Sequence, residues 1–167
     1  MILVYTGAGK GKTCASVGQA IRAHGQGMKV CFAQFMKRPD QAGEQRMLAK
    51  MLGDGFFAGG RGFFRQKETR DEHREAALNV LSWSRRMMGQ ADMLVLDESL
   101  YALGSGILQD DELQNLVLEA RTKGVHLVLS GRGLPDWLRD QADLITEMTE
   151  VKHHFSTGKK ALPGIEY

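Results

Sequence analysis

The stretch VYTGAGKGKTCAS, from Val4 to Ser16, constrains the fold of this chain more than any other feature. It places glycines and lysines between a short apolar run and an amphipathic segment, which predicts a strand, a tight loop and a helix in that order. The segment from Thr6 to Thr13 follows the pattern G-x-x-x-x-G-K-[ST] at every position but the first, where threonine stands. A loop of this kind predicts a site for the phosphates of a nucleotide.

The residue types in this loop suit a triphosphate. Gly7, Gly9 and Gly11 allow successive backbone N–H groups to turn inward and form a concave anion site. Lys12 adds a positive charge, the Thr13 hydroxyl can ligate magnesium, and the following helix directs its positive end toward bound oxygens. Gly7, one place along from the missing first glycine, can take the tight turn. A glycine-rich turn with incidental lysines is the disfavoured alternative.

Short apolar runs alternate with amphipathic segments along the chain, which is typical of a parallel sheet covered on both faces. Right-handed crossovers then give a doubly wound arrangement. We therefore expect an α/β fold, a three-layer sandwich with a mostly parallel central sheet of the P-loop NTPase (RecA-like) type, in a single domain over 1–167. The expected strands are 2–5, 29–35, 92–98, 125–129 and 144–148, with a short strand at 56–57 inside an irregular loop, and the expected helices are 12–24, 43–52, 69–88, 110–122 and 135–141.

Composition narrows the classes of protein that remain. At 167 residues and 43% apolar content, the chain is long enough for one buried core. The formal net charge of +2 gives no large electrostatic footprint for nucleic acid, and no apolar stretch approaches the ~20 residues of a membrane span. Cys14 and Cys31 stand in segments that we expect to be buried, as free thiols in a reducing compartment. We expect a cytoplasmic protein that binds neither nucleic acid nor membrane.

Two carboxylates follow the apolar run MLVL. Asp97 and Glu98 stand at the carboxyl end of an expected strand, where ligands bind in such sheets and where the acid that holds magnesium is usually found. A solvated helix cap is the alternative for such a pair by itself, and the glycine-rich loop favours the metal interpretation. We expect a metal set of Thr13, Asp97 and Glu98, with Glu98 as the preferred ligand and Asp97 near the Thr13 hydroxyl.

Three more basic residues belong to the same edge of the sheet. Arg132 follows an expected strand in LSGRG and should contact phosphate or the loop carboxylates, unless it is a plain surface arginine. Lys37 follows the strand at 29–35, and Lys10 adds charge inside the loop. By themselves, these residues predict a nucleotide and magnesium site without specifying the reaction.

The sequence resembles the ATP:corrinoid adenosyltransferases, the cob(I)alamin adenosyltransferases that carry a phosphate-binding loop. The resemblance covers nearly the whole chain, and the loop of this family also begins with threonine. An ordered set of blocks carries it: VYTGAGKGKT (4–13), AIRAHGQG (20–27), AQFMK (33–37), GE (43–44), GF (62–63), LVLDE (94–98), SGRG (130–133), ADLITEM (142–148), VKHHF (151–155) and GIEY (164–167).

This resemblance implies a reaction and its participants. In the family, a corrinoid reduced to the Co(I) state attacks the 5′ carbon of the ATP ribose, and inorganic triphosphate leaves. The implied cofactor is Mg²⁺, the cosubstrate is ATP, and the substrate is cobalamin or a corrinoid precursor. A homodimer and an electron-donating reductase, expected to be a flavoprotein, are implied as well. Because the nucleophile is the substrate's cobalt, the protein must supply geometry and leaving-group stabilisation rather than a nucleophilic side chain.

The resemblance also assigns roles to residues. Glu98 matches the family's magnesium-associated carboxylate. Phe63 matches an aromatic residue that helps displace the lower axial ligand of the corrinoid, although a loop aromatic packed on the core is the alternative. The expected catalytic residues are Lys12, Phe63 and Arg132, and the expected nucleotide-binding residues are Thr6, Gly7, Ala8, Gly9, Lys10, Gly11, Lys12, Thr13, Cys14 and Lys37.

The chain departs from the family in several places. Ala8 replaces a polar loop residue, Cys14 stands where a second threonine is usual, and Arg65 stands where better-known relatives carry a tryptophan. Relatives often begin with an extra helical segment, whereas the first expected strand starts here at Ile2. A nucleotide-hydrolysing switch or motor and a non-catalytic binder of ATP or corrinoid stay open as alternatives. The phosphate product, triphosphate or ADP with phosphate, would distinguish a transferase from a hydrolase.

Overall fold

The computed structural model describes residues 1–64, 69–154, 158 and 160–167. Its centre is a six-stranded sheet in the order β3-β2-β4-β5-β1-β6, and every described pair of neighbouring strands is parallel. The strands are β1 (Ile2–Thr6), β2 (Val30–Gln34), β3 (Phe56–Ala58), β4 (Met93–Asp97), β5 (His126–Ser130) and β6 (Leu144–Glu147). The helices are α1 (Lys12–Gly25), α2 (Gly43–Leu52), α3 (Arg70–Met88), α4 (Ser99–Gly104), α5 (Asp110–Thr122) and α6 (Asp136–Gln141), with a 3₁₀ turn η1 (Gly53–Gly55).

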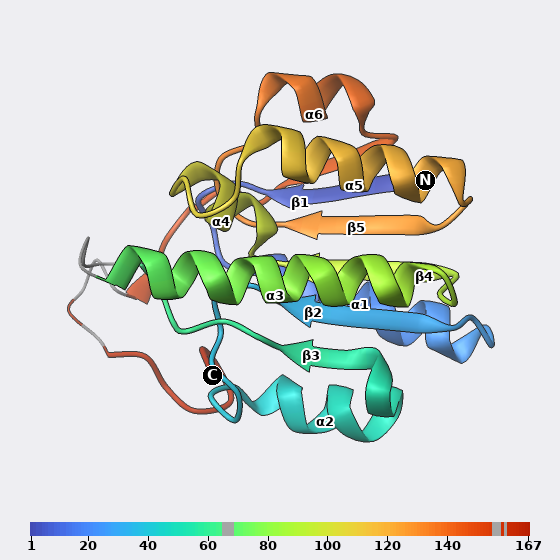
Figure 1. Cartoon of the computed structure of the whole chain (residues 1–167). Coiled ribbons are helices and arrows are strands. Elements are labelled where there is room, and N and C mark those ends of the chain that lie inside the picture. Colours follow the sequence, from blue (N-terminus) through green and yellow to red (C-terminus); the bar gives the residue numbers. More distant parts are fainter. Residues whose placement is uncertain (65–68, 155–157, 159) are drawn as a thin grey trace.

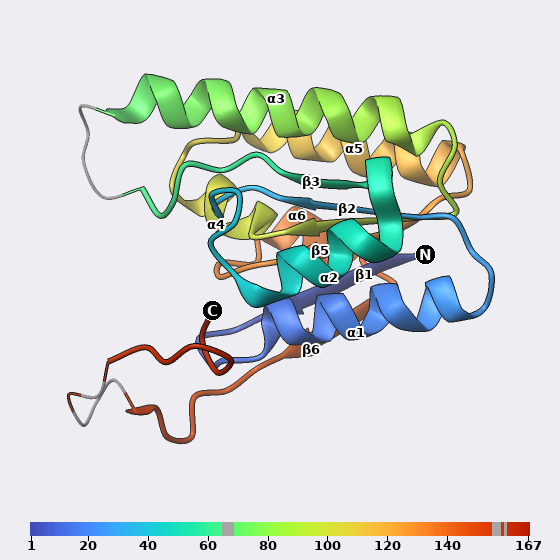
Figure 2. The same cartoon turned by 90° about the horizontal axis from the view of Figure 1, so that it is seen from below.

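Helices cover both faces of the sheet, with α1 and α2 on one side and α3 and α5 on the other (Figure 2). The two-residue period of the strands explains this arrangement, because successive side chains point to opposite faces. In β4, Leu94 and Leu96 belong to the apolar core that includes residues of α3 and α5, whereas Met93 and Val95 belong to the core under α1 and α2. The expected three-layer α/β sandwich is confirmed, and its described sheet is entirely parallel.

The expected helices and strands are all present with closely similar bounds, and one helix was not expected. Helix α4 follows directly after Asp97 and Glu98, and Glu98 itself is its N-cap in a left-handed backbone conformation. Arg65 and Phe155, which the comparison with the family singled out, lie outside the described residues.

All six strands run in one direction, so their carboxyl ends meet at one edge of the sheet, on the left in Figure 1. The loop from β1 to α1, the segment after β2, and the turns after β4 and β5 all start from this edge. The neighbouring strands β1 and β5 lead to opposite faces of the sheet, because α1 packs in one core and Leu138 of α6 packs in the other core with α3 and α5. In open parallel sheets a crevice for ligands forms at such a point.

One cysteine prediction was wrong. Cys31 is buried as expected, but Cys14 is exposed. Helix α1 turns Lys12, Ser16 and Ala20 toward the sheet, so that Cys14 faces outward. Within the described residues, no helix is long and apolar enough to cross a membrane.

Candidate nucleotide and metal site

The loop between β1 and α1 adopts backbone conformations that favour glycine. Gly7 and Gly11 have φ angles of 102° and 120°. Space is limited as well, because a Cβ atom at Gly7 would collide with the carbonyl oxygen of Met148. The backbone N–H of Gly9 donates a hydrogen bond of 2.7 Å to the same oxygen. The shape of the loop therefore depends on the segment that follows β6.

The side chain of Lys12 is buried and forms hydrogen bonds across the inside of this loop. Its Nζ donates to the carbonyl oxygens of Gly7 and Gly9 at 2.8 and 2.7 Å. Burial lowers the pKa of Lys12, and the charge of Glu98 opposes that effect. The ammonium group thus lies where the loop pattern predicts a phosphate contact, held in place by carbonyl groups of the loop.

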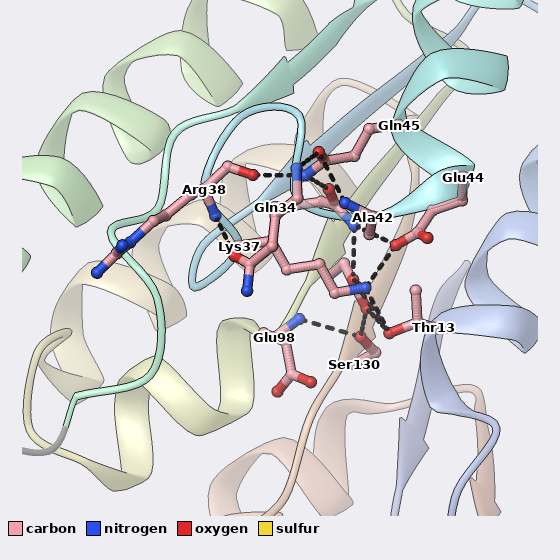
Figure 3. A network of polar contacts seen from close by, with 11 residues as sticks. Thr13, Gln34, Lys37, Arg38, Ala42, Glu44, Gln45, Glu98 and Ser130 are labelled. Atoms are coloured by element: carbon pink, nitrogen blue, oxygen red, sulfur yellow. Dashed lines mark hydrogen bonds and ion pairs between the residues drawn. The ribbon is translucent and has the colours of Figure 1, made fainter. Parts of the chain in front are cut away.

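Asp97, at the end of β4, is fully buried, and its carboxylate accepts hydrogen bonds from three side chains that are labelled in Figure 3. The Thr13 hydroxyl donates to Oδ1 at 3.1 Å, Ser130 Oγ donates to Oδ1 at 2.7 Å, and Gln34 Nε2 donates to Oδ2 at 3.1 Å. The prediction that Asp97 lies near the Thr13 hydroxyl is confirmed. Such charge-assisted bonds stabilise a carboxylate that has lost its contact with water.

Glu98 differs sharply from its neighbour Asp97. Its φ angle of 60° is unusual for a residue other than glycine, and its backbone N–H donates to Ser130 Oγ at 3.1 Å. The side chain points away from Lys37 and Ser130 (Figure 3). Desolvation, followed by repulsion from Asp97, raises the pKa of Glu98 to about 7. A nearby cation would favour the ionised form of this carboxyl group.

Lys37, beyond the end of β2, reaches the same group of oxygens. Its Nζ lies 2.6 Å from Glu44 Oε1, 3.5 Å from Asp97 Oδ2 and 3.4 Å from Thr13 Oγ1. Burial by itself would lower the pKa of Lys37, but the charges of Asp97 and Glu44 outweigh it, so the pKa stands above its ordinary value. Sequence reasoning placed Lys37 at this edge but missed Glu44 as a site residue, although the GE block was the signal for it.

Arg132 and Lys10 lie on the outer side of the loop. Arg132 donates to the carbonyl oxygen of Ala8 at 3.1 Å, so its contact with the loop region is made through a backbone group. Lys10 Nζ lies 3.9 Å from a carboxylate oxygen of Glu166, which brings the C-terminal segment next to the loop. A cavity of about 350 Å³ adjoins this side; Gly7, Ala8, Arg132, Arg139 and Glu147 are among its lining residues.

An aromatic pair lies beside α4. The Phe63 side chain is 47% exposed, and its ring meets that of Tyr101 edge to face, with 5.3 Å between the ring centroids. Phe64 packs instead against His73 and the apolar core. Phe63 therefore offers an exposed aromatic surface, unlike the core-packed alternative considered for it. Tyr101 was missed because the helix that carries it was not expected.

The oxygen donors of this edge fit a magnesium ion that arrives with a nucleotide. Mg²⁺ usually takes one or two protein oxygens and completes its shell with phosphate oxygens and water. Thr13, Asp97 and Glu98 provide such oxygens next to the glycine-rich loop. In the part of the chain that the structure describes, no cluster of three or more His, Cys, Asp or Glu side chains could hold a metal by itself.

Known proteins of one family are similar to this chain over its whole length. The family described as ATP:corrinoid adenosyltransferase BtuR/CobO/CobP matches residues 1–167. The corrinoid adenosyltransferase CobA of Salmonella typhimurium is 36% identical over 169 residues, covering 100% of this chain and 85% of its own length. A corrinoid adenosyltransferase of a Sinorhizobium species is 35% identical, covering 100% of this chain and 80% of its own length. Among solved structures, a DNA replication initiation factor matches 88% of this chain and 39% of its own, at 15% identity and a TM-score of 0.47.

Proposed function

This chain belongs to the ATP:corrinoid adenosyltransferase family, and on that premise we propose that it transfers the 5′-deoxyadenosyl group of ATP to the Co(I) centre of a reduced corrinoid. The observation that best supports the proposal is the position of buried Lys12 and of the hydrogen-bonded Thr13–Asp97 pair at the glycine-rich loop, where a polyphosphate would bind. The cobalt centre supplies the electron pair of the new cobalt–carbon bond. As that bond forms, the bond from C5′ to the phosphate oxygen breaks, and inorganic triphosphate leaves with its electron pair.

In this proposal the loop acts on the leaving group. Its backbone N–H groups and the start of α1 bind triphosphate oxygens, as helix N-termini and glycine-rich loops do. Lys12 exchanges the carbonyl oxygens of Gly7 and Gly9 for phosphate oxygens, and Arg132 joins from the outer side. Thr13, Asp97 and Glu98 would hold a magnesium ion, whose positive charge would neutralise part of the charge of the polyphosphate. Charge that grows on the departing anion is thereby stabilised by groups already in position.

The aromatic side of the edge serves the corrinoid. Phe63, supported by Tyr101, would present an apolar surface to the lower face of the corrinoid and keep an axial donor away from cobalt. Loss of that donor lowers the energy of the orbital that accepts the electron, so reduction from Co(II) to Co(I) becomes easier. We further propose a cytoplasmic homodimer of one-domain chains, which receives electrons from a separate reductase, expected to be a flavoprotein.

The decisive experiment identifies the phosphate product. Purified protein is mixed with Mg²⁺, ATP and chemically reduced cobalamin, and the products are separated by anion exchange while the corrinoid spectrum is followed. We expect adenosylated corrinoid and intact triphosphate in equal amounts. Formation of ADP and phosphate, or no reaction beyond that of a protein-free control, would contradict the proposal.

A further inference from the structure

The ammonium group of Lys37 lies among the oxygens that would surround a divalent cation. Its three oxygen neighbours are Thr13 Oγ1 at 3.4 Å, Asp97 Oδ2 at 3.5 Å and Glu44 Oε1 at 2.6 Å. Two of these neighbours, Thr13 and Asp97, are residues that the proposed function assigns to magnesium. A magnesium ion bound there would therefore compete with Lys37 for the same oxygen atoms.

Burial explains why a cation is needed there when no metal is bound. Asp97 is fully buried, and a carboxylate taken out of water needs hydrogen bonds and a counter-charge. Thr13, Ser130 and Gln34 supply the hydrogen bonds, all from neutral groups. Lys37 is the cation that the structure places within 4 Å of this carboxylate among the described residues.

Glu44 is a second ion-pair partner for Lys37, besides Asp97. The 2.6 Å bond to Glu44 is the shortest of the three contacts of the ammonium group. Glu44 is fixed in turn by Gln34 Nε2 at 3.2 Å, and Gln34 accepts a hydrogen bond from Gln45 at 2.8 Å. The side chain of Lys37 can thus leave Asp97 and Thr13 and keep its strongest ion pair.

We propose that Lys37 is a positioning residue that holds the metal position in the nucleotide-free protein and is displaced toward Glu44 when magnesium binds with the triphosphate. This inference deepens the proposed function and rests on its assignment of magnesium to the Thr13–Asp97 side. Because a metal ion must first displace Lys37, the nucleotide-free protein binds bare divalent cations weakly. The metal then binds well only when phosphate oxygens complete its coordination shell and offset the loss of the lysine contact.

Manganese binding to the nucleotide-free protein tests this role without any turnover, because bound and free Mn²⁺ are distinguished by electron paramagnetic resonance. Lys37→Met should raise the affinity for Mn²⁺ by roughly tenfold, since one like charge beside the metal is gone. Lys37→Arg keeps the charge and should bind as weakly as the wild type. Glu44→Gln should lower the affinity further, because Lys37 then pairs with Asp97 alone. Lys50→Met, an exposed lysine of α2, is the matched control and should change nothing.

A lysine that only supports the fold gives the opposite result, because its removal would damage the site and weaken Mn²⁺ binding. Unchanged or reduced affinity in a folded Lys37→Met protein would overturn the inference. Should that variant fail to fold, a crystal structure of the wild type with Mg²⁺ and inorganic triphosphate decides the matter. We expect Lys37 Nζ to lie beside Glu44 and away from Asp97, and a lysine still bonded to Thr13 and Asp97 next to bound magnesium would overturn the inference.

The same titration separates this inference from the proposed function. Wild-type protein with inorganic triphosphate should bind Mn²⁺ far more tightly than protein without it. Failure of that step would contradict the metal assignment itself, and the role of Lys37 with it. Tight binding with triphosphate combined with no shift in the Lys37→Met variant would overturn the role of Lys37 alone.

Discussion

Two regions at the same edge of the sheet differ in how deeply their central side chain is buried and in how many side-chain contacts it makes. Around Asp97, a fully buried carboxylate accepts hydrogen bonds from three neighbouring side chains and faces a lysine. Around Phe63, by contrast, an aromatic side chain is 47% exposed and has one ring partner, Tyr101, among the described residues. The side chains of the first region already hold one another in place, whereas the exposed ring of the second leaves an apolar surface that a flat, apolar ligand would cover.

The difference follows from what each region would bind. A polyphosphate carries concentrated charge, and preorganised donors and cations stabilise such charge best because they need not reorient during the reaction. A corrinoid offers a broad apolar face, for which exposed aromatic area is sufficient. Mutations in the first region should therefore affect stability and chemistry strongly, whereas mutations in the second should act mainly on the corrinoid.

The strongest test of the ordered region is Asp97→Ala. It leaves Lys37 and the donors around the lost carboxylate without their shared partner, so we expect the free energy of unfolding to fall by about 3–5 kcal/mol. Urea denaturation followed by circular dichroism measures this loss. Asp54→Ala, in the turn η1 and exposed, is the control and should cost no more than about 0.5 kcal/mol. Equal stability of the two variants would show that the Asp97 cluster does not stabilise the fold.

Lys12→Ala tests the chemistry of the same region. Removal of one preorganised charge from the leaving-group site should lower kcat by roughly 10²–10³-fold. The measurement is a single-turnover assay with chemically reduced cobalamin, and far-ultraviolet circular dichroism confirms that the variant is folded. Activity close to that of the wild type would contradict the role given to the loop.

The pH dependence of stability tests Glu98. Its pKa is about 7 in the folded protein against an ordinary value of 4.5, so the folded state holds the proton more tightly than the unfolded chain. This contribution to stability is complete below pH of about 4.5 and is lost as the pH rises through about 7. Metal-free wild type should thus lose ~3 kcal/mol between pH 4.5 and 8 relative to Glu98→Gln, which cannot ionise. Denaturation curves of the two proteins that stay parallel across this range would refute the shift.

Phe63→Ala tests the exposed region and should have the smallest effect. We expect roughly a tenfold loss when Co(II) must be reduced during the assay, little loss with pre-reduced Co(I), and a stability change within about 0.5 kcal/mol. Leu118→Ala, which truncates an exposed apolar side chain on α5, serves as the control. Equal losses in the two assays would show that Phe63 does not act on the reduction step.

Sequence reasoning predicted the sheet and most helices because local signals and tertiary packing agree there. Strands β2 and β4 are buried throughout and apolar up to their last residues, Gln34 and Asp97, as strands covered on both faces should be. Helix α4 was missed because it is short and begins at a left-handed Glu98, which is not a usual cap residue. The exposure of Cys14 was also missed, since α1 buries only the stripe of residues that faces the sheet.

Part of the candidate site could be predicted, and part could not. Lys12, Thr13 and Asp97 were found because a glycine-rich loop and an acid at a strand end have fixed places in a parallel sheet. The contacts of Lys37 with Glu44 and of Phe63 with Tyr101 depend on how separate elements pack against one another. Spacing along the chain does not encode such contacts, so only the three-dimensional structure could show them.

The contact between the glycine-rich loop and the segment after β6 also limits how the chain could be shortened or rearranged. Met148 is far from Gly7 and Gly9 in sequence, yet its carbonyl oxygen would collide with a Cβ atom at Gly7 and accepts a hydrogen bond from the N–H of Gly9. A truncated protein that ended before β6 would retain all residues of the phosphate-binding motif but would lack the segment around Met148 that packs against the loop. We expect such a fragment to lose affinity for triphosphate, which makes the last strand a requirement for nucleotide binding rather than a dispensable edge.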